Sequence, residues 1–262
     1  MKAVLIRVGF DLNWGGIRGP VFNDGHFLFI PVPEDKKECG RIKNPTRYSD
    51  SEIPALSEYM PNDILKSNGK NIRIEDCIVH NDPEFETFTY GDHKSNGRGG
   101  AVKTLQHGDY IIFLAGLVPY KKDTYINRSL NYIREKQREL ETKICIVGYF
   151  RVAWVKMYSD ITEQERKQIK NTHLKRDPQD EDLIIVKGDE KDSRFLKKAF
   201  CVSKPGKNKA DSRYYVTSDK FKDITGLAGQ IQRGYRKILD EEKVKNLIKV
   251  LNNTSLWRVF DV

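Results

Sequence analysis

The sequence lacks the features of a disulfide-stapled, cysteine-metal or membrane protein. Its four cysteines, Cys39, Cys77, Cys145 and Cys201, are far apart and form no CxxC pair, so neither a cysteine zinc site nor a disulfide framework is expected. No apolar run approaches the roughly 20 residues that span a bilayer. Residues 2–6 enter an apolar strand directly, without a signal-peptide cleavage site. We therefore expect a cytoplasmic protein with reduced thiols and no membrane partner.

The common phosphate-binding motifs are also absent. Neither GxGxxG nor a Walker A motif occurs, and no amphipathic helix follows the glycine-rich stretch at 9–20, which has four glycines in twelve residues. Glycine permits a positive φ and a close approach of the backbone to a ligand. The stretch also holds Asp11, Asn13, Trp14 and Arg18. This density favours a binding loop; the alternative is a structural turn between a strand at 3–8 and a strand at 26–31.

Charge is abundant. Charged residues make up 32% and hydrophobic residues 38% of the 262 positions, enough to bury one large core or two modest ones. The net charge of +9 and the pI near 9.2 favour an anionic partner, either nucleic acid or a nucleotide. The lysines are spread along the chain, however, which also fits a charge that serves solubility alone.

Three apolar runs predict the central sheet. The run at 143–156 is rich in β-branched and aromatic residues, and Gly148 in its middle indicates a bulge or a close backbone approach. The runs at 110–117 and 183–186 are its expected partners. The sequence thus predicts an α+β fold with a strongly curved mixed sheet or a small β-barrel, flanking helices and a helical C-terminal part. We expect an α+β domain at 1–203 and a helical extension at 204–262 packed on it.

Helices are expected from apolar periodicity and capping signals. Thr162 and Glu165 form a capping box, which begins one of them. The expected helices lie near 53–59, at 101–105, 125–141, 162–170 and 195–200, around Leu227, Ile231, Ile238 and Leu239, and around Val244, Leu247, Ile248 and Leu251. Trp257 and Phe260 are expected to anchor the C-terminus to the body.

Polar residues in the loops are the candidates for a site. His80 and Asp82 are two apart, so in an extended segment they point to the same side and could serve as a base and its orienting partner or as two metal ligands. The alternative is that Asp82 begins a turn with Pro83 and that His80 caps it. Nearby, Tyr90 and Asp92 stand in a second short segment, TYGD.

Two further segments carry cations. Asn171, His173 and Arg176 close a helix, where their alternative role is to complement the helix dipole. The stretch at 188–194 precedes the expected helix at 195–200, whose N-terminus with Arg194 could hold a phosphate. The alternative there is a plain N-cap by Asp192 or Ser193.

Several stretches, in this order, resemble a known family. They are RVGFDLNWGGIRGPVFNDG, FIPVP, VHNDPEF, TYGD, GDYIIFLAG, ICIVGYFRV, NTHLKR and GDEKDSRFLKKA. Over roughly residues 3–203 the chain is similar to the nucleotide modification associated domain family, type three. The resemblance implies an α+β domain that accompanies base-modification enzymes in phages and in prokaryotic defence or modification systems, and it carries over no catalytic residue. The strands GDYIIFLAG and ICIVGYFRVAWV are also similar, more weakly, to base-recognising PUA, ASCH and EVE barrels.

Three functions follow from these observations. The first is an enzyme acting on a nucleotide or nucleobase, with His80 or His173 as proton carrier, Asp82 as partner and no cofactor identified. A metal held by these three residues is the less favoured variant, because their spacing matches no known ligand pattern. Substrate-binding residues would be Asp11, Trp14, Arg18, Tyr90, Asp92, Asn171, Arg176, Asp189, Ser193 and Arg194, in one cleft.

The second function is a reader of a modified base, and the third is a scaffold subunit. A reader would stack the base on aromatic residues in a basic groove. Its candidate aromatics are Trp14, Tyr90, Tyr149, Phe150 and Trp154. Core packing is their alternative role, and for Phe150 and Trp154 it is the preferred one.

Overall fold

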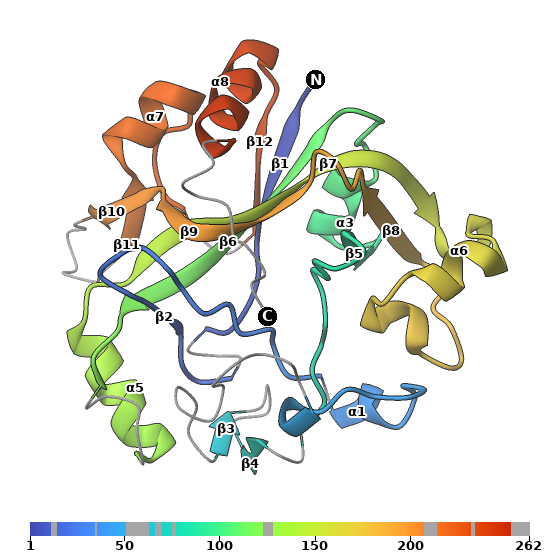
Figure 1. The fold of residues 1–262 in the computed structure, drawn as a ribbon, viewed down its shortest axis with the longest axis horizontal. Helices are drawn as coiled ribbons and strands as arrows, with labels where there is room; N and C mark the ends of the chain where they lie inside the picture. The colour runs from blue at the N-terminus through green and yellow to red at the C-terminus, as the bar shows by residue number, and fades with distance from the viewer. Residues whose placement is uncertain are drawn as a thin grey trace.

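The computed structural model describes residues 1–11, 15–34, 36–50, 63–65, 70–74, 77–122, 128–206, 214–231 and 234–252. Trp14, the expected helix near 53–59, Trp257 and Phe260 lie outside these residues. The fold is α+β, as predicted, and is built on one large mixed sheet (Figure 1).

The sheet has eight strands. Its main path is β12 (Tyr235–Ile238), β1 (Ala3–Arg7), β6 (Tyr110–Pro119), β7 (Lys143–Met157), β8 (Leu183–Gly188) and β5 (Thr89–His93), with β2 (Gly19–Val21) on β6 and β9 (Arg194–Cys201) on β7. Strands β1 and β2 run parallel to β6, and the other pairs are antiparallel. The predicted pairing of the three apolar runs is therefore confirmed. The described strands follow an open path and do not close into a barrel.

Strand β7 is the longest element and organises the sheet. One of its edges pairs with β6, while β9 and β8 follow one another along the other edge. The register shifts between Ile146 and Gly148 against β9. A Cβ on Gly148 would lie 2.5 Å from the Phe85 ring and 2.9 Å from the carbonyl of Arg194. The predicted bulge and close approach at Gly148 are thus both present.

The helices lie around the rim of the sheet (Figure 1). They are α1 (Lys36–Cys39), α3 (Gly97–Val102), α5 (Leu130–Glu139), α6 (Glu163–Gln168), α7 (Asp219–Thr225) and α8 (Glu241–Leu251). Short 3-10 turns form at η1 (Tyr48–Asp50), η3 (Tyr158–Asp160) and η4 (Thr172–Lys175), and two small hairpins pair β3 (Asp63–Leu65) with β4 (Asn71–Arg73) and β10 (Ser203–Gly206) with β11 (Tyr214–Thr217). The capping box of Thr162 and Glu165 is confirmed at the start of α6. None of the described helices combines the length and apolar character that crossing a membrane requires.

Two expected helices are wrong. Residues 195–200 belong to strand β9, so no helix N-terminus forms beside Arg194, and neither Asp192 nor Ser193 caps a helix there. Residues 235–238 form β12, which pairs with β1. Between Leu227 and Leu239 the backbone has positive φ at Gly229 and Gly234, which a continuous helix cannot accommodate. The segment at 26–31, expected as a strand, forms only isolated bridges at His26 and Phe27.

Among the described residues, three hydrophobic clusters fill the interior, and the smallest consists of Ile161, Leu183 and Ile185. The largest joins β1, β6, β7 and β8 to apolar residues of α8, including Val244 and Leu247. The second packs Leu130 and Ile133 of α5 against residues of the N-terminal loops, such as Phe10 and Ile17. The apolar faces predicted for α5 and α8 are therefore buried. Beyond these clusters, β5 and η4 hold a group of buried polar residues.

Candidate active site

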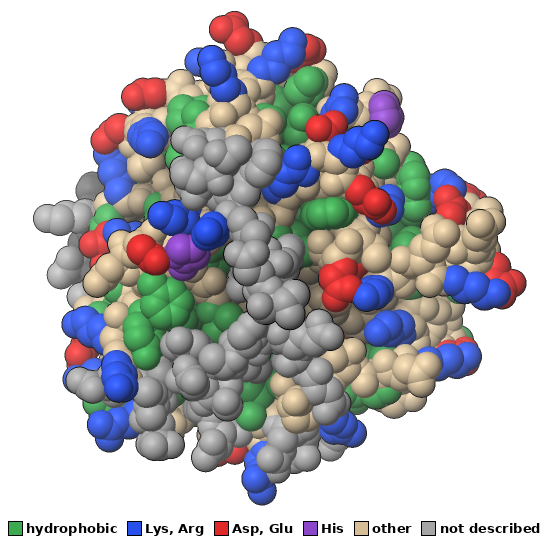
Figure 2. Space-filling model, viewed as in Figure 1, with side chains coloured by type: hydrophobic (Ala, Val, Ile, Leu, Met, Phe, Trp, Pro, Cys, Tyr) green, Lys and Arg blue, Asp and Glu red, His purple; other side chains and the backbone are tan. Residues whose placement is uncertain are grey.

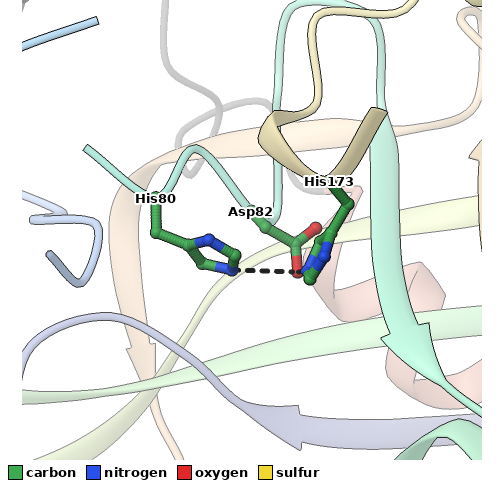
Figure 3. Close-up of side chains that lie close together, drawn as sticks. All are labelled: His80, Asp82 and His173. Atoms are coloured by element: carbon green, nitrogen blue, oxygen red, sulfur yellow. Dashed lines mark ion pairs between the residues drawn. The ribbon is translucent and has the colours of Figure 1, made fainter. Parts of the chain in front are cut away.

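Two segments, at 79–82 and 171–176, meet beside β5. The backbone N–H of Asn81 donates to Thr172 Oγ1 (2.8 Å). Asn171 caps η4 by accepting from the His173 N–H (3.0 Å). These bonds bring the side chains of His80, Asp82 and His173 together (Figure 3). The three side chains are 15%, 5% and 9% exposed, respectively. The two segments that the sequence singled out by their histidines thus form one buried cluster.

Asp82 lies between the two imidazoles. Its Oδ1 accepts from the Gly91 N–H (2.8 Å) and from Asn171 Nδ2 (2.7 Å). Its Oδ2 is 3.9 Å from His80 Nε2 and 3.6 Å from His173 Nε2. The first oxygen is therefore fixed by two donors, while the second faces both rings at distances longer than a hydrogen bond.

Glu34 orients His80. Its Oε2 is 2.8 Å from His80 Nδ1. Burial alone would raise the pKa of Glu34, but the hydrogen bond and charge of His80, together with Arg176, outweigh it and lower that pKa to about 2. Glu34 is therefore a carboxylate that can only accept, so the proton of a neutral His80 ring is on Nδ1. In that neutral ring the lone pair is on Nε2, which lies 3.9 Å from Asp82 Oδ2.

Arg176 orients His173. Its Nη1 is 3.0 Å from His173 Nδ1, and its Nη2 is 2.9 Å from Glu34 Oε1. A guanidinium has no acceptor, so Nδ1 of His173 accepts and a neutral ring carries its proton on Nε2. Burial lowers the pKa of His173, and the charges of His80 and Arg176 lower it further against the opposing effect of Asp82. His173 is therefore held as a neutral imidazole.

Glu34 is the member of the cluster that the sequence did not single out. It follows Pro33 and lies outside every strand and helix expected from the sequence. Its position is set by backbone pairing, because the His80 N–H donates to the Val32 carbonyl and the Glu34 N–H to the Ile78 carbonyl, both at 2.9 Å. Nothing local in the sequence signals this pairing, since the partners are 46 residues apart.

Tyr90 and Asp92 lie on the other face of β5. Gly91, between them, faces His173, and successive residues of a strand point to opposite faces. The Asp92 carboxylate instead accepts from the Tyr90 hydroxyl (2.8 Å) and pairs with Arg98 Nε (3.2 Å). The two residues therefore belong to a separate buried network.

The other predicted binding residues bond to groups outside the cluster of His80, Asp82 and His173. Asp189 accepts from the backbone of Lys191 (2.9 Å), Ser193 Oγ accepts from the Arg151 N–H (3.1 Å), and Arg194 donates to the Ser193 carbonyl (2.7 Å). In the glycine-rich stretch, Asp11 bridges to Gly15, and the Arg18 backbone bonds with Gln137. Trp14 lies outside the described residues.

A pocket of about 430 Å³ has Arg176 in its lining. Its lining residues are Lys43, Asn44, Tyr158, Leu174, Lys175, Arg176, Asp177 and Gln179. Lys43 is paired with Asp177 at 2.6 Å. The pocket is therefore next to the cluster and shares Arg176 with it.

The positive charge is not gathered on the face drawn in Figure 2. There the coloured lysine and arginine side chains alternate with acidic ones around the molecule. The coloured residues of this face form no continuous basic stripe of the kind that follows a nucleic-acid backbone.

Comparison with known proteins gives a family and no closer match. No curated protein and no solved structure matches the chain. The family model described as nucleotide modification associated domain 3 matches residues 2–233, which confirms the resemblance found in the sequence and extends it past residue 203. The chain belongs to the nucleotide modification associated domain 3 family.

Proposed function

We propose that the protein is an enzyme that acts on a nucleotide or nucleobase, in base modification or its removal, and that His80, Asp82 and His173 form its reactive centre. The family supports the substrate class. The observation that carries the proposal is the convergence of two histidines and a carboxylate from distant segments, each with its outward-facing atom fixed by another buried group. A purely structural turn does not need this arrangement.

The reactive atom is Nε2 of His80. Glu34 holds Nδ1–H, so the lone pair of Nε2 is aimed at the gap between the three side chains. Glu34 also stabilises the positive charge that the ring gains when it takes a proton, as a carboxylate does for a histidine base. His173 lines the other side of the gap as a neutral ring. Such a centre can activate a water molecule or a polar group of the substrate.

The test is turnover by the His80→Ala and His173→Ala proteins on a panel of nucleotides and modified DNA. Loss of a general acid or base lowers rates by about 10²–10⁴-fold. We expect losses of that size in both variants. The control is His107→Ala, because His107 is exposed and bonds only to a backbone carbonyl among its described contacts. Unchanged turnover in both site variants would remove the proposal.

A PUA- or EVE-like reader of modified bases is the second candidate from the sequence. Three of its stacking residues, Tyr90, Tyr149 and Phe150, are 3%, 1% and 0% exposed and pack in the core. They have no free face for a base, so the enzyme is the better supported function. A scaffold subunit beside base-modification enzymes in a prokaryotic or phage system would not need a buried centre.

A further inference from the structure

The gap between His80, Asp82 and His173 has the geometry of a metal site. Each residue offers one ligand atom, and these atoms lie within 4.8 Å of one another. We propose that the gap binds one divalent transition-metal ion of the zinc class, through Nε2 of His80, Oδ2 of Asp82 and Nε2 of His173. This goes beyond the proposed function, because it concerns an ion and holds whatever the substrate is.

The distances between the three side chains fit ligands of one shared ion better than hydrogen bonds between the side chains themselves. The two Nε2–Oδ2 separations of 3.9 and 3.6 Å exceed any hydrogen bond. Ligands about 2.0–2.2 Å from a tetrahedral ion lie about 3.3–3.5 Å from each other. The three ligand atoms lie within 4.8 Å of one another, so the widest separation would have to close by up to about 1.5 Å as the rings rotate onto the ion. Nitrogen and carboxylate oxygen together are a donor set typical of zinc and related ions.

The residues behind two of the three ligands, His80 and Asp82, are arranged as in metal sites. A histidine ligand usually donates its other ring N–H to a carboxylate or carbonyl, as His80 does to Glu34 at 2.8 Å. A carboxylate ligand is usually held through its second oxygen, as Asp82 is by Gly91 and Asn171. Among the described residues, no other set of three His, Cys, Asp or Glu ligand atoms converges this closely.

One contact must change when the ion binds. Arg176 donates to Nδ1 of His173, which leaves the ring proton on Nε2. Metal binding at Nε2 moves that proton to Nδ1, so the Arg176 Nη1 contact must open. Glu34 at 2.9 Å and Glu38 at 3.4 Å remain as partners of the guanidinium. Arg176 can therefore withdraw from His173 without losing its counter-charges.

Three protein ligands leave at least one position on the ion open. Catalytic zinc sites use this position for water or substrate, and the ion lowers the pKa of the bound water to about 7. With the ion in place, Nε2 of His80 is a ligand and no longer takes a proton, so this site would replace the base role proposed above, and the bound water would supply the nucleophile.

The experiment is a binding titration of the full-length protein after removal of metal with a chelator. Zn²⁺ is followed by calorimetry, and Co²⁺ by its visible absorption. We expect one equivalent of each ion per chain and a Co²⁺ spectrum of a site with nitrogen and oxygen ligands. Fewer than about 0.2 equivalents, or no Co²⁺ band, would overturn the proposal.

Variants locate the ion. In Asp82→Asn the amide oxygen can still accept from Gly91 and Asn171, while a donor replaces the ligand oxygen. We expect Asp82→Asn, His80→Ala and His173→Ala each to weaken Zn²⁺ binding by at least tenfold, and Glu34→Gln by about 10–100-fold. The control His107→Ala should bind as the wild type does. Circular dichroism shows whether each variant is folded. If His80→Ala is not folded, His80→Gln replaces it.

Binding that is equal in wild type and all four variants would also overturn the proposal, because the ion would then lie elsewhere. The result is separable from the enzyme proposal. If no ion binds but turnover still requires His80, the enzyme stands and the metal does not. If an ion binds but substitution of His80, Asp82 or His173 leaves turnover unchanged, the metal site is supported and the enzyme proposal fails.

Discussion

Glu34 connects the two halves of the centre. It is 5% exposed, and its two oxygens bond to His80 and Arg176. Removing one partner of a buried ion pair typically costs about 3–5 kcal/mol, because the other charge is left buried without compensation. We expect Glu34→Gln to lower the free energy of unfolding by roughly 2–4 kcal/mol, since the amide keeps some hydrogen bonding. Urea denaturation measures the change.

The matched control is the exposed ion pair beside it. Lys43 and Asp177 are 2.6 Å apart, with side chains 72% and 57% exposed. Solvent screens an exposed ion pair, so Lys43→Ala should unfold at nearly the same urea concentration as the wild type. An equally small change in Glu34→Gln would mean that Glu34 does not carry the charge balance of the centre.

At this scale the sequence predicts part of the site. His80 with Asp82 is visible as a pair two residues apart. Asn171 and His173 were expected to close the helix at 162–170, but that helix ends at Gln168, and Asn171 instead begins the separate turn η4. Arg176 was interpreted as an anion binder, whereas its guanidinium is paired with Glu34 and directs His173. That role depends on a carboxylate 142 residues away, which no local pattern can reveal.

Strand β5 sets the position of His173 through Gly91. A Cβ at Gly91 would lie 2.7 Å from His173 Cδ2 and 3.1 Å from Ile185 Cδ1, so the ring must move. We expect Gly91→Ala to cost about 1–3 kcal/mol by overpacking. It should also lower turnover, since a shift of about 1 Å in a catalytic group can cost 10²-fold. Thermal unfolding and the nucleotide assay measure the two effects.

Gly100→Ala in α3 is the control for that substitution. Its Cβ would meet only the Lys94 carbonyl, at 3.9 Å, and alanine favours a helix. The wild-type melting temperature and turnover should be kept or slightly raised. If Gly91→Ala behaves in the same way, β5 does not position His173.

Strands that are buried on both faces could be predicted from the sequence. For segments with few buried residues, the sequence does not distinguish a helix from a strand. The runs that form β6, β7 and β8 are continuous and apolar, as in strands that are buried on both faces. Their composition therefore predicts that they lie together in the centre of one sheet. In β9 the two fully or nearly buried residues are Leu196 and Phe200, four apart. This spacing fits one face of a helix and one face of a strand equally well. The segment forms a strand because one edge of β7 is available to pair with it. That edge exists only in the folded chain, so the local sequence cannot show it.

For the whole molecule, buried tyrosines couple stability to alkaline pH. Burial raises the pKa of Tyr149 to about 12 and raises the pKa of Tyr48, Tyr90 and Tyr110. In the unfolded chain these phenols titrate near pH 10. Above that pH the unfolded chain loses protons that the folded chain keeps, so the free energy of unfolding falls as pH rises. Below pH 10 this contribution is fully present and constant.

Tyr149→Phe tests this coupling, because Tyr149 is 1% exposed. Each unit of pKa difference corresponds to about 1.4 kcal/mol, so Tyr149 contributes up to roughly 2–3 kcal/mol of the loss between pH 10 and 12. In urea denaturation from pH 8.5 to 11.5, Tyr149→Phe should show a shallower decline above pH 10 than the wild type. Tyr235→Phe, at a residue 39% exposed, should run parallel to the wild type. A parallel line for Tyr149→Phe would show that this phenol ionises without opening the core.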